Sequence, residues 1–145
     1  MWCSQTFSKS CEYLHPLYKR LELRYIIERA VNYEKYSLPF VYIEITDFEY
    51  DPPGDDVLGE YLVIENQGTA NQNMTGWKLK NDENETFRFP AYILKAGASV
   101  TVWTKEGVNS ETDLYWGSET PIWSNHGDCA TLLDGSHQLV DWECY

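Results

Sequence analysis

After Phe40 the sequence consists of short runs in which apolar and polar residues alternate, and Gly, Pro, Asn and Asp separate these runs. Alternation places the apolar side chains on one face of each strand, and many short strands of this kind are typical of an antiparallel sandwich or barrel. We therefore predict a mainly β domain, an immunoglobulin-like antiparallel β-sandwich, over residues 41–145. Strands are expected at residues 41–48, 60–65, 77–80, 86–89, 99–104, 130–133 and 138–142, with a further extended piece near 113–116.

The alternation also indicates which side chains form the core. Polar residues separate Ile43 from Ile45, and Leu62 is separated from Ile64 by one residue that faces the other way. Each strand therefore offers one apolar face to a shared core, and we expect two sheets packed face to face. The same pattern recurs at Trp77, Leu79, Phe87 and Phe89.

Residues 1–40 form an N-terminal extension that we expect to be partly helical. Residues 1–12 are polar and have no period, which indicates a disordered or loosely attached segment. Over residues 17–36 apolar residues recur at helical spacing, although residues 21–27 also alternate as a strand would. We prefer a short helix that ends at Leu38-Pro39. If its apolar stripe finds no place on the sandwich, self-association through residues 17–36 should follow. The stripe consists of Leu23, Ile26, Ile27, Ala30 and Val31.

Charge is distributed unevenly along the chain. The formal net charge of the chain is −12. Residues 41–145 carry −14, with five Lys and Arg against nineteen Asp and Glu, and residues 1–40 carry +2. Binding to a phosphate backbone depends on Lys and Arg, so we do not expect nucleic acid as the partner. No apolar run reaches the ~20 residues of a membrane helix, and the N-terminus lacks the pattern of a signal peptide. These features favour a cytoplasmic location.

The cysteines Cys3, Cys11, Cys129 and Cys144 form no C-x-x-C pair and have no histidine at zinc-like spacing. If the turn at residues 134–137 joins two antiparallel strands, Cys129 falls opposite Trp142, with Cys144 diagonal to it on the same face. A bulge would bring the two cysteines opposite each other. A disulfide between Cys129 and Cys144 is one outcome. Free buried thiols are the other, which the absence of an export signal favours.

No pattern in the sequence indicates catalysis. His15, His126 and His137 are expected in loops and a turn. Cys129 follows His126 by three residues, but a nucleophile and a base so close on one segment seldom reach a productive geometry. We therefore expect neither an enzyme nor a bound cofactor.

One acidic stretch contains Asp51, Asp55 and Asp56, whose carboxylates are the hard oxygen ligands that calcium prefers. The stretch does not match the twelve-residue calcium loop, and the same residues are common in hairpin connections. We expect a solvated turn rather than a metal site.

Short motifs follow one another in a specific order across the β part of the chain. They are Gly59-Glu60-Tyr61-Leu62-Val63, Thr75-Gly76-Trp77-Lys78-Leu79, Phe87-Arg88-Phe89-Pro90, Leu94-Lys95-Ala96-Gly97, Val102-Trp103 and Trp123-Ser124-Asn125-His126-Gly127-Asp128. Together they resemble the lamin tail domain, the immunoglobulin-like globular tail of nuclear lamins, over residues 41–145. Gly127-Asp128-Cys129-Ala130, with Asp141, is more similar to a prokaryotic relative.

The resemblance implies a non-enzymatic interaction or scaffold module. In nuclear lamins this tail contacts nuclear-envelope proteins and chromatin, whereas in bacteria and archaea it is attached to other domains or stands nearly alone. We expect the domain to bind a protein partner through its loops or through an exposed sheet edge, for which residues 41–48 and 77–80 are the candidates.

An accessory module that binds carbohydrate or another surface ligand is the alternative. Such a module would use exposed aromatic rings. Nucleic-acid binding is a third and less favoured interpretation, because the body of the domain is acidic. The candidate ligand-contacting rings are Tyr115, Trp116, Trp123 and Trp142.

Overall fold

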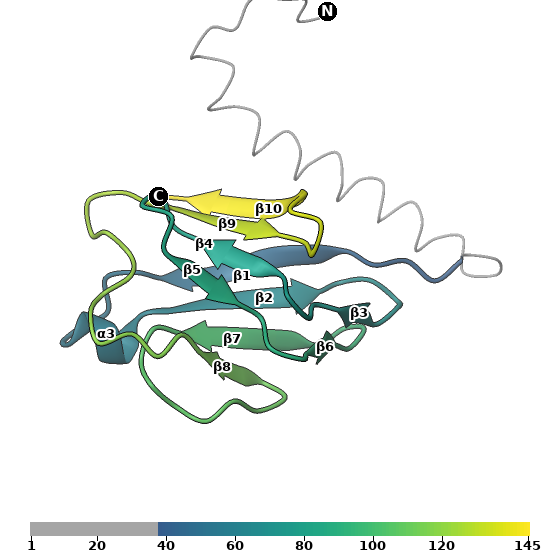
Figure 1. The fold of residues 1–145 in the computed structure, drawn as a ribbon, viewed down its shortest axis with the longest axis horizontal. Helices are drawn as coiled ribbons and strands as arrows, with labels where there is room; N and C mark the ends of the chain where they lie inside the picture. The colour runs from purple at the N-terminus through teal and green to yellow at the C-terminus, as the bar shows by residue number, and fades with distance from the viewer. Residues whose placement is uncertain (1–37) are drawn as a thin grey trace, which may run out of the picture. The chain divides into compact units, whose positions relative to one another are not determined.

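Residues 38–145, which the computed structural model describes, contain two four-stranded sheets packed face to face (Figure 1). The predictions for residues 1–37, including the helix and self-association over 17–36, lie outside the described residues. The compact unit is Pro39–Tyr145. One sheet has the order β1 (Ile43–Glu49), β2 (Tyr61–Asn66), β7 (Ser99–Trp103), β8 (Asp113–Tyr115), and the other β10 (Leu139–Cys144), β9 (Cys129–Leu133), β4 (Lys78–Lys80), β5 (Thr86–Arg88). A small third sheet pairs β3 (Gln72–Asn73) with β6 (Ile93–Leu94), and α3 (Asp56–Gly59) is one short turn of helix.

The prediction of an immunoglobulin-like sandwich is confirmed, and the alternation of the sequence explains its core. In β2, Leu62 and Ile64 are fully buried whereas Tyr61 and Val63 are half-buried on the outer face. Leu79 and Leu132 fill the facing positions of the second sheet. A buried aliphatic side chain stabilises the fold by about 1.5–3 kcal/mol. The remaining large core side chains include Ile45, Phe89, Leu94, Val100, Val102 and Leu114.

Two details of the sheets differ from the sequence predictions. β4 pairs with β5 on one side and β9 on the other, so the prediction that residues 77–80 form an exposed edge is wrong. The sheet is also not purely antiparallel, because β7 and β8 run parallel. A long loop separates these two strands and returns the chain to the starting end of β7, which allows the parallel pairing.

The side of the sandwich formed by β1 and β10 is linked across the two sheets. The backbone N–H of Ile45 donates to Asp141 Oδ2 at 2.8 Å. A bulge between Ile45 and Asp47 interrupts the β1–β2 ladder at this point. β1 is an edge strand, as expected for residues 41–48. One of its backbone N–H groups, that of Ile45, already donates a hydrogen bond to a carboxylate of the opposite sheet.

A second bulge sets the position of the cysteines. It lies between Leu139 and Asp141 and shifts the β9–β10 register by one residue, so Cys144 pairs directly with Cys129. The two residues form a disulfide that encloses a loop with a sequence separation of 15. Of the two outcomes left open by the sequence, the structure contains the disulfide.

β8 is the edge of the first sheet, and the loop before it occupies its outer side. Asp113 N donates to Ser110 Oγ at 2.9 Å, and Ser110 N donates to Asp113 O at 2.8 Å. Tyr115 N donates to Asn109 Oδ1 at 3.0 Å. Both outward N–H groups of β8 and the carbonyl of Asp113 are thus satisfied within the domain, which disfavours pairing of another strand there.

Glu60 is a buried carboxyl group that holds together three parts of the chain. Its Oε2 accepts hydrogen bonds from Thr104 Oγ1 at 2.8 Å and from Ile122 N at 3.0 Å. Its side chain is fully buried, and its Oε1 has no partner. Burial raises the pKa of Glu60, while the donors from Ile122, Thr104 and Trp123 oppose that rise. The segment after β8 is therefore attached to the start of β2.

Among residues 38–145 no helix is both long enough and apolar enough to cross a membrane.

Candidate functional site

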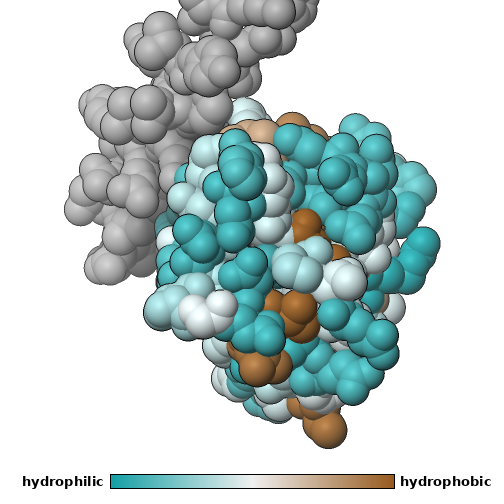
Figure 2. Space-filling view, turned by 90° about the vertical axis from the view of Figure 1, so that its left-hand side faces the viewer, coloured by the Kyte–Doolittle hydropathy of each residue, from teal (hydrophilic) through white to brown (hydrophobic). Residues whose placement is uncertain are grey.

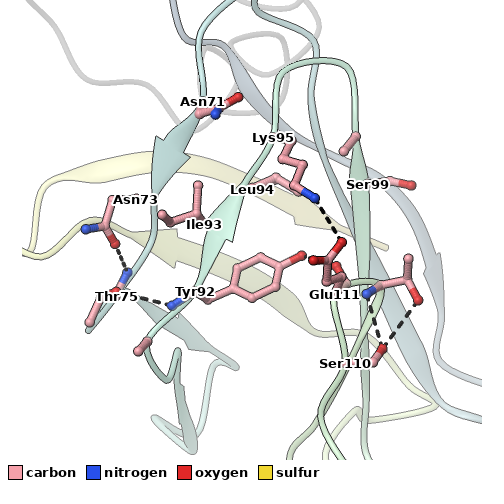
Figure 3. Close-up of a pocket in the computed structure, with 13 residues that line it drawn as sticks. Asn71, Asn73, Thr75, Tyr92, Ile93, Leu94, Lys95, Ser99, Ser110 and Glu111 are labelled. Carbon is pink, nitrogen blue, oxygen red and sulfur yellow. Dashed lines mark hydrogen bonds and ion pairs between the residues drawn. The ribbon is translucent and has the colours of Figure 1, made fainter.

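A groove of about 680 Å³ opens where the small β3–β6 sheet meets the loop before β8 (Figure 3). We call it the Tyr92 groove, after the ring that lies within it. Four segments line it: residues 71–75, 91–95, 98–99 and 110–112. These segments are far apart in the sequence, and the two-residue pairing of Gln72 with Leu94 and of Asn73 with Ile93 brings the first two together.

Tyr92 is held at both its backbone and its side chain. Its backbone N–H donates to Thr75 Oγ1 at 3.2 Å, and its hydroxyl donates to the carbonyl oxygen of Glu111 at 2.6 Å. Burial raises the pKa of the Tyr92 hydroxyl, and the negative charges of Glu111 and Asp113 add to this effect. The hydroxyl therefore remains protonated near neutral pH and serves as a hydrogen-bond donor that positions the 110–112 loop.

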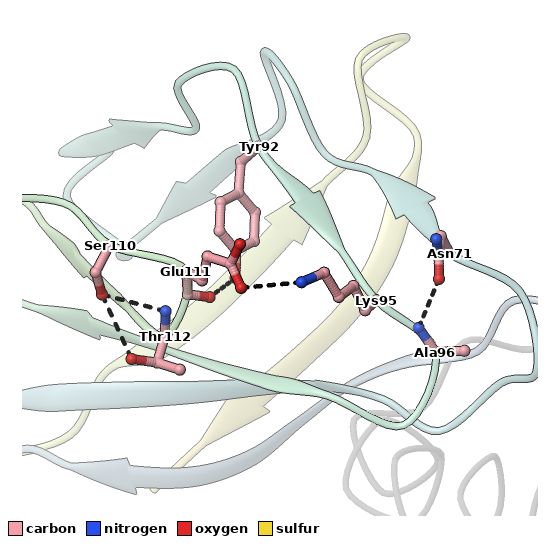
Figure 4. A network of polar contacts seen from close by, with 7 residues as sticks. All are labelled: Asn71, Tyr92, Lys95, Ala96, Ser110, Glu111 and Thr112. Carbon is pink, nitrogen blue, oxygen red and sulfur yellow. Dashed lines mark hydrogen bonds and ion pairs between the residues drawn. The ribbon is translucent and has the colours of Figure 1, made fainter.

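An ion pair joins the two sides of the groove (Figure 4). Lys95 Nζ lies 2.9 Å from Glu111 Oε2, and both side chains are largely exposed. The hydrogen bond and the positive charge of Lys95 lower the pKa of Glu111. Because the pair is open to water, a ligand can reorganise it at little cost. The groove can therefore accept a polar or charged group at this rim.

The remaining polar groups of the groove are mostly engaged in local turns. Asn71 Oδ1 accepts from Ala96 N at 3.0 Å, and Asn73 Oδ1 accepts from Thr75 N at 3.0 Å. Ile93 projects beside them and is 57% exposed, which is unusual for a large apolar side chain. The lining thus combines an aromatic ring, an exposed aliphatic group, amides and hydroxyls. Such a lining fits recognition of a side chain or peptide and contains no nucleophile paired with a base.

The model of the Lamin Tail Domain family matches residues 39–145, which is the whole of the sandwich. The chain belongs to the lamin tail domain family. Membership agrees with the sandwich architecture.

This lamin tail domain does not bring its four candidate ligand-contacting aromatics together. Trp123 is 3% exposed and packs against Phe48 at a centroid distance of 4.6 Å, so its ring is part of the core. Trp116 is half-buried, and its ring lies nearly perpendicular to that of Trp123, at 85°. Trp142 lies on β10 in the other sheet. Trp123 is buried because its ring packs against the rings of Phe48 and Trp116.

Tyr115 lies instead in a row of aromatics on the outer face of the first sheet. The register aligns Tyr61 of β2 with Trp103 of β7 and Trp103 with Tyr115 of β8. The rings of Tyr61 and Trp103 are 5.2 Å apart and inclined by 55°. Lys105 Nζ lies 4.0 Å above the Trp103 ring, a cation–π contact. The row is therefore partly occupied by the domain's own ammonium group.

The three aspartates of the acidic stretch before β2 contact neighbouring groups of this lamin tail domain. Asn125 Nδ2 contacts Asp51 Oδ1 at 3.3 Å and Asp56 Oδ2 at 3.2 Å, whereas Asp55 Oδ1 accepts from Leu58 N at 3.3 Å and caps α3. Among the described residues, no three His, Cys, Asp or Glu side chains are grouped so that they could hold a metal ion. The three aspartates act as turn and capping residues.

The Cys/His pair considered from the sequence is not available for nucleophilic chemistry. Cys129 is bonded to Cys144, and the His126 backbone N–H donates to Ser124 Oγ at 3.2 Å in a loop. His137 lies in the β9–β10 turn with a positive φ of 63°, and its Nε2 is 2.9 Å from Lys78 Nζ. His15 lies outside the described residues.

The end of the domain that includes α3 offers no broad apolar surface. Figure 2 shows this end covered mainly by hydrophilic residues, with hydrophobic residues in small separate areas. This end is therefore not suited to a ligand that binds through a large hydrophobic surface.

Proposed function

We propose that this lamin tail domain is a non-enzymatic interaction module that binds a protein partner, with the Tyr92 groove as one contact surface. The observation that carries the proposal is the exposed Ile93 beside a held aromatic ring and a solvent-open ion pair. An apolar anchor with polar groups at its rim is the usual composition of a protein-binding surface. Family membership supports the same class of function.

The test compares capture of partners from host lysate by the full chain and by two variants. Ile93→Glu places a charge at the rim of the groove, whereas Leu58→Glu changes a side chain of similar exposure, 60%, on α3. We expect a partner that survives moderate salt to be retained by the wild type and by Leu58→Glu, and lost by Ile93→Glu. A wild-type chain that retains no protein would refute the proposal.

A second candidate function is binding of carbohydrate or another surface ligand, which the aligned Tyr61, Trp103 and Tyr115 favour. Aromatic rings in register on a sheet face are suited to stacking against sugar rings. Titration of polysaccharides against tryptophan fluorescence tests it, with Trp103→Phe as the variant that should lose the response. An unchanged wild-type emission across the titrations would exclude it. Nucleic acid stays the least favoured ligand because of the acidic body.

Two further proposals concern origin and compartment. The run Gly127-Asp128-Cys129-Ala130, with Asp141, supports a relative from the prokaryotic branch of the family. The sequence favours a cytoplasmic location, whereas a disulfide between Cys129 and Cys144 is typical of an oxidising compartment. Alkylation of free thiols in the protein isolated from its host tests the compartment. Labelling of Cys129 and Cys144 would support the cytoplasm, and protection would support export.

A further inference from the structure

The outward main-chain groups of the β5 edge are open, whereas at β8 the preceding loop accepts from both outward N–H groups. β5 pairs with β4, and Phe89 N donates to Trp77 O at 3.0 Å. Because the direction of backbone groups alternates along a strand, the N–H and C=O groups of Thr86 and Arg88 point away from β4. Within residues 38–145 no strand, loop or side chain bonds to these groups. This edge can therefore accept another strand.

Three cations surround the β5 edge on its outer face. Leu79 and Phe87 face the core, so Lys78 and Lys80 of β4 and Arg88 of β5 face outward. Lys78 and Arg88 are directly opposite each other in the register. Like charges at opposed positions destabilise a sheet. An anion placed across this edge would relieve that repulsion.

The domain does not neutralise these three charges itself. Lys78 Nζ contacts the His137 ring, and Lys80 Nζ donates to Asn84 Oδ1 at 2.8 Å. Among the described residues, no carboxylate forms an ion pair with Lys78, Lys80 or Arg88. This is unexpected where nineteen Asp and Glu accompany five Lys and Arg in residues 41–145.

The two other cations of the domain are already engaged. Lys95 pairs with Glu111 at 2.9 Å. Lys105 lies over the Trp103 ring and donates to Leu58 O at 3.1 Å. The positive charge that remains for a partner is therefore concentrated at one edge of an otherwise acidic body.

The inner side of the β5 edge has a different chemistry. Trp116 is half-buried and packs against Phe87, whose ring centroid is 5.7 Å away. A strand added beside β5 would direct alternate side chains to the two faces. Those on the outer face would meet the three cations, and those on the inner face would meet the exposed part of Trp116. An occupant with alternating acidic and apolar residues matches both.

We propose that the β5 edge binds an extended acidic peptide by strand addition, with Arg88 and Lys80 as the charge-selective contacts. The inference rests on the proposed function in that the domain is an interaction module, and it assigns a second surface and the chemistry of its partner. A second copy of β5 is a poor occupant, because it would bring two sets of the same cations together. The short β5, Thr86–Arg88, limits the pairing to a few residues.

The test uses the full chain and a ten-residue peptide of alternating Glu and Val, blocked at both ends. Two control peptides separate the contributions: one replaces every Glu by Lys, and one carries N-methyl groups on alternate residues along the pairing edge. We expect the acidic peptide to bind at least about tenfold more tightly than either control. Chemical shift changes in residues 86–88 should accompany binding.

Variants of the protein locate the contact. Arg88→Glu and Lys80→Glu should each weaken binding of the acidic peptide by about tenfold, and Arg88→Glu should improve binding of the Lys peptide. Thr86→Pro removes an outward N–H that β4 does not use, and should weaken binding without unfolding the domain. Lys105→Glu is the matched control, because it removes a cation that follows β7 of the other sheet, and should leave binding unchanged within about twofold.

Binding that is equal for the acidic and Lys peptides, or that survives N-methylation or Arg88→Glu, would overturn the proposal. So would the absence of binding at millimolar peptide. The proposed function fails separately, when the wild-type chain captures no partner at all. A captured partner whose binding depends on Ile93, together with no binding of the acidic peptide, would leave the proposed function intact and refute the β5 assignment.

Discussion

β8 and β5 are both short edge strands of three residues, but they differ in whether the domain itself bonds to their outward backbone groups. At β8 the preceding loop supplies Ser110 and Asn109 to the outward backbone groups. At β5 the outward groups of Thr86 and Arg88 have no partner among residues 38–145, and cations flank them. An edge can be protected from pairing by its own loop or by charge, and charge leaves the edge open to an occupant of opposite sign.

The largest expected effect comes from removing the side chain that anchors the open edge. Phe87→Ala should lower the free energy of unfolding by about 3–5 kcal/mol, because the buried ring contacts Phe89 and Trp116. Arg88→Ala, next to it but exposed, should change stability by less than about 0.5 kcal/mol. Urea unfolding of the full chain measures both. Equal effects would mean that β5 is not a packed strand and that the comparison does not hold.

A third edge, β10, is secured covalently, and this bond gives the next largest effect. Replacing both Cys129 and Cys144 by Ser should lower the free energy of unfolding by about 3 kcal/mol, the value expected for a closed loop of 15 residues. Thermal unfolding with and without reductant provides the comparison. Reductant should affect the wild type and leave the double variant unchanged. A wild type insensitive to complete reduction would contradict this prediction.

Removing the loop side chains that bond to the outer side of β8 should have a smaller effect on stability than loss of the disulfide. Ser110→Ala together with Asn109→Ala removes the acceptors for Asp113 N and Tyr115 N, and should lower stability by about 1 kcal/mol for each lost bond. The matched change at the other edge, Thr86→Ala, should stay within about 0.5 kcal/mol. Hydrogen exchange at the Asp113 and Tyr115 amides should accelerate in the double variant. Protection that is unchanged there would show that the loop side chains do not cap β8.

The smallest effect concerns Glu60, which attaches the segment following β8. Burial raises its pKa above 4.5, so the folded state binds a proton more tightly than the unfolded chain. Its contribution to stability is fully present below pH 4.5 and is lost as the pH rises through the folded pKa. Glu60→Gln should remove this dependence while changing stability at pH 4 by less than about 1 kcal/mol, since an amide oxygen can accept the same two bonds. Identical pH profiles for the two proteins would refute the assignment.

Alternation of residue types was sufficient to predict the sandwich and most of its strands, since burial on one face follows directly from the period of two. It could not predict which strands are neighbours. Trp77 and Leu79 alternate in the same way whether β4 is central or at an edge. The one-residue bulge that aligns Cys144 with Cys129 also leaves the alternation signal weak, because Val140 and Asp141 are both half-buried.

The candidate sites were harder to predict because tertiary packing creates them. β3 and β6 have two residues each, too few to show a period. The Tyr92 groove depends on that pairing and on a loop that arrives from beyond β7. The β5 edge combines a strand that the sequence does predict with cations from its neighbour, and only the register shows that Lys78 lies opposite Arg88.

The disulfide also determines how the domain would respond to mechanical force. Tension applied at Tyr145 passes from Cys144 directly to Cys129, and so to the interior strand β9, before β10 can peel away. The loop closed by the two cysteines, whose sequence separation is 15, then stays unextended when the rest of the sandwich unfolds. At roughly 3.5 Å per residue, the oxidised chain lengthens by about 50 Å less than the reduced chain. The β9–β10 hairpin can therefore extend under force only after the disulfide has been reduced.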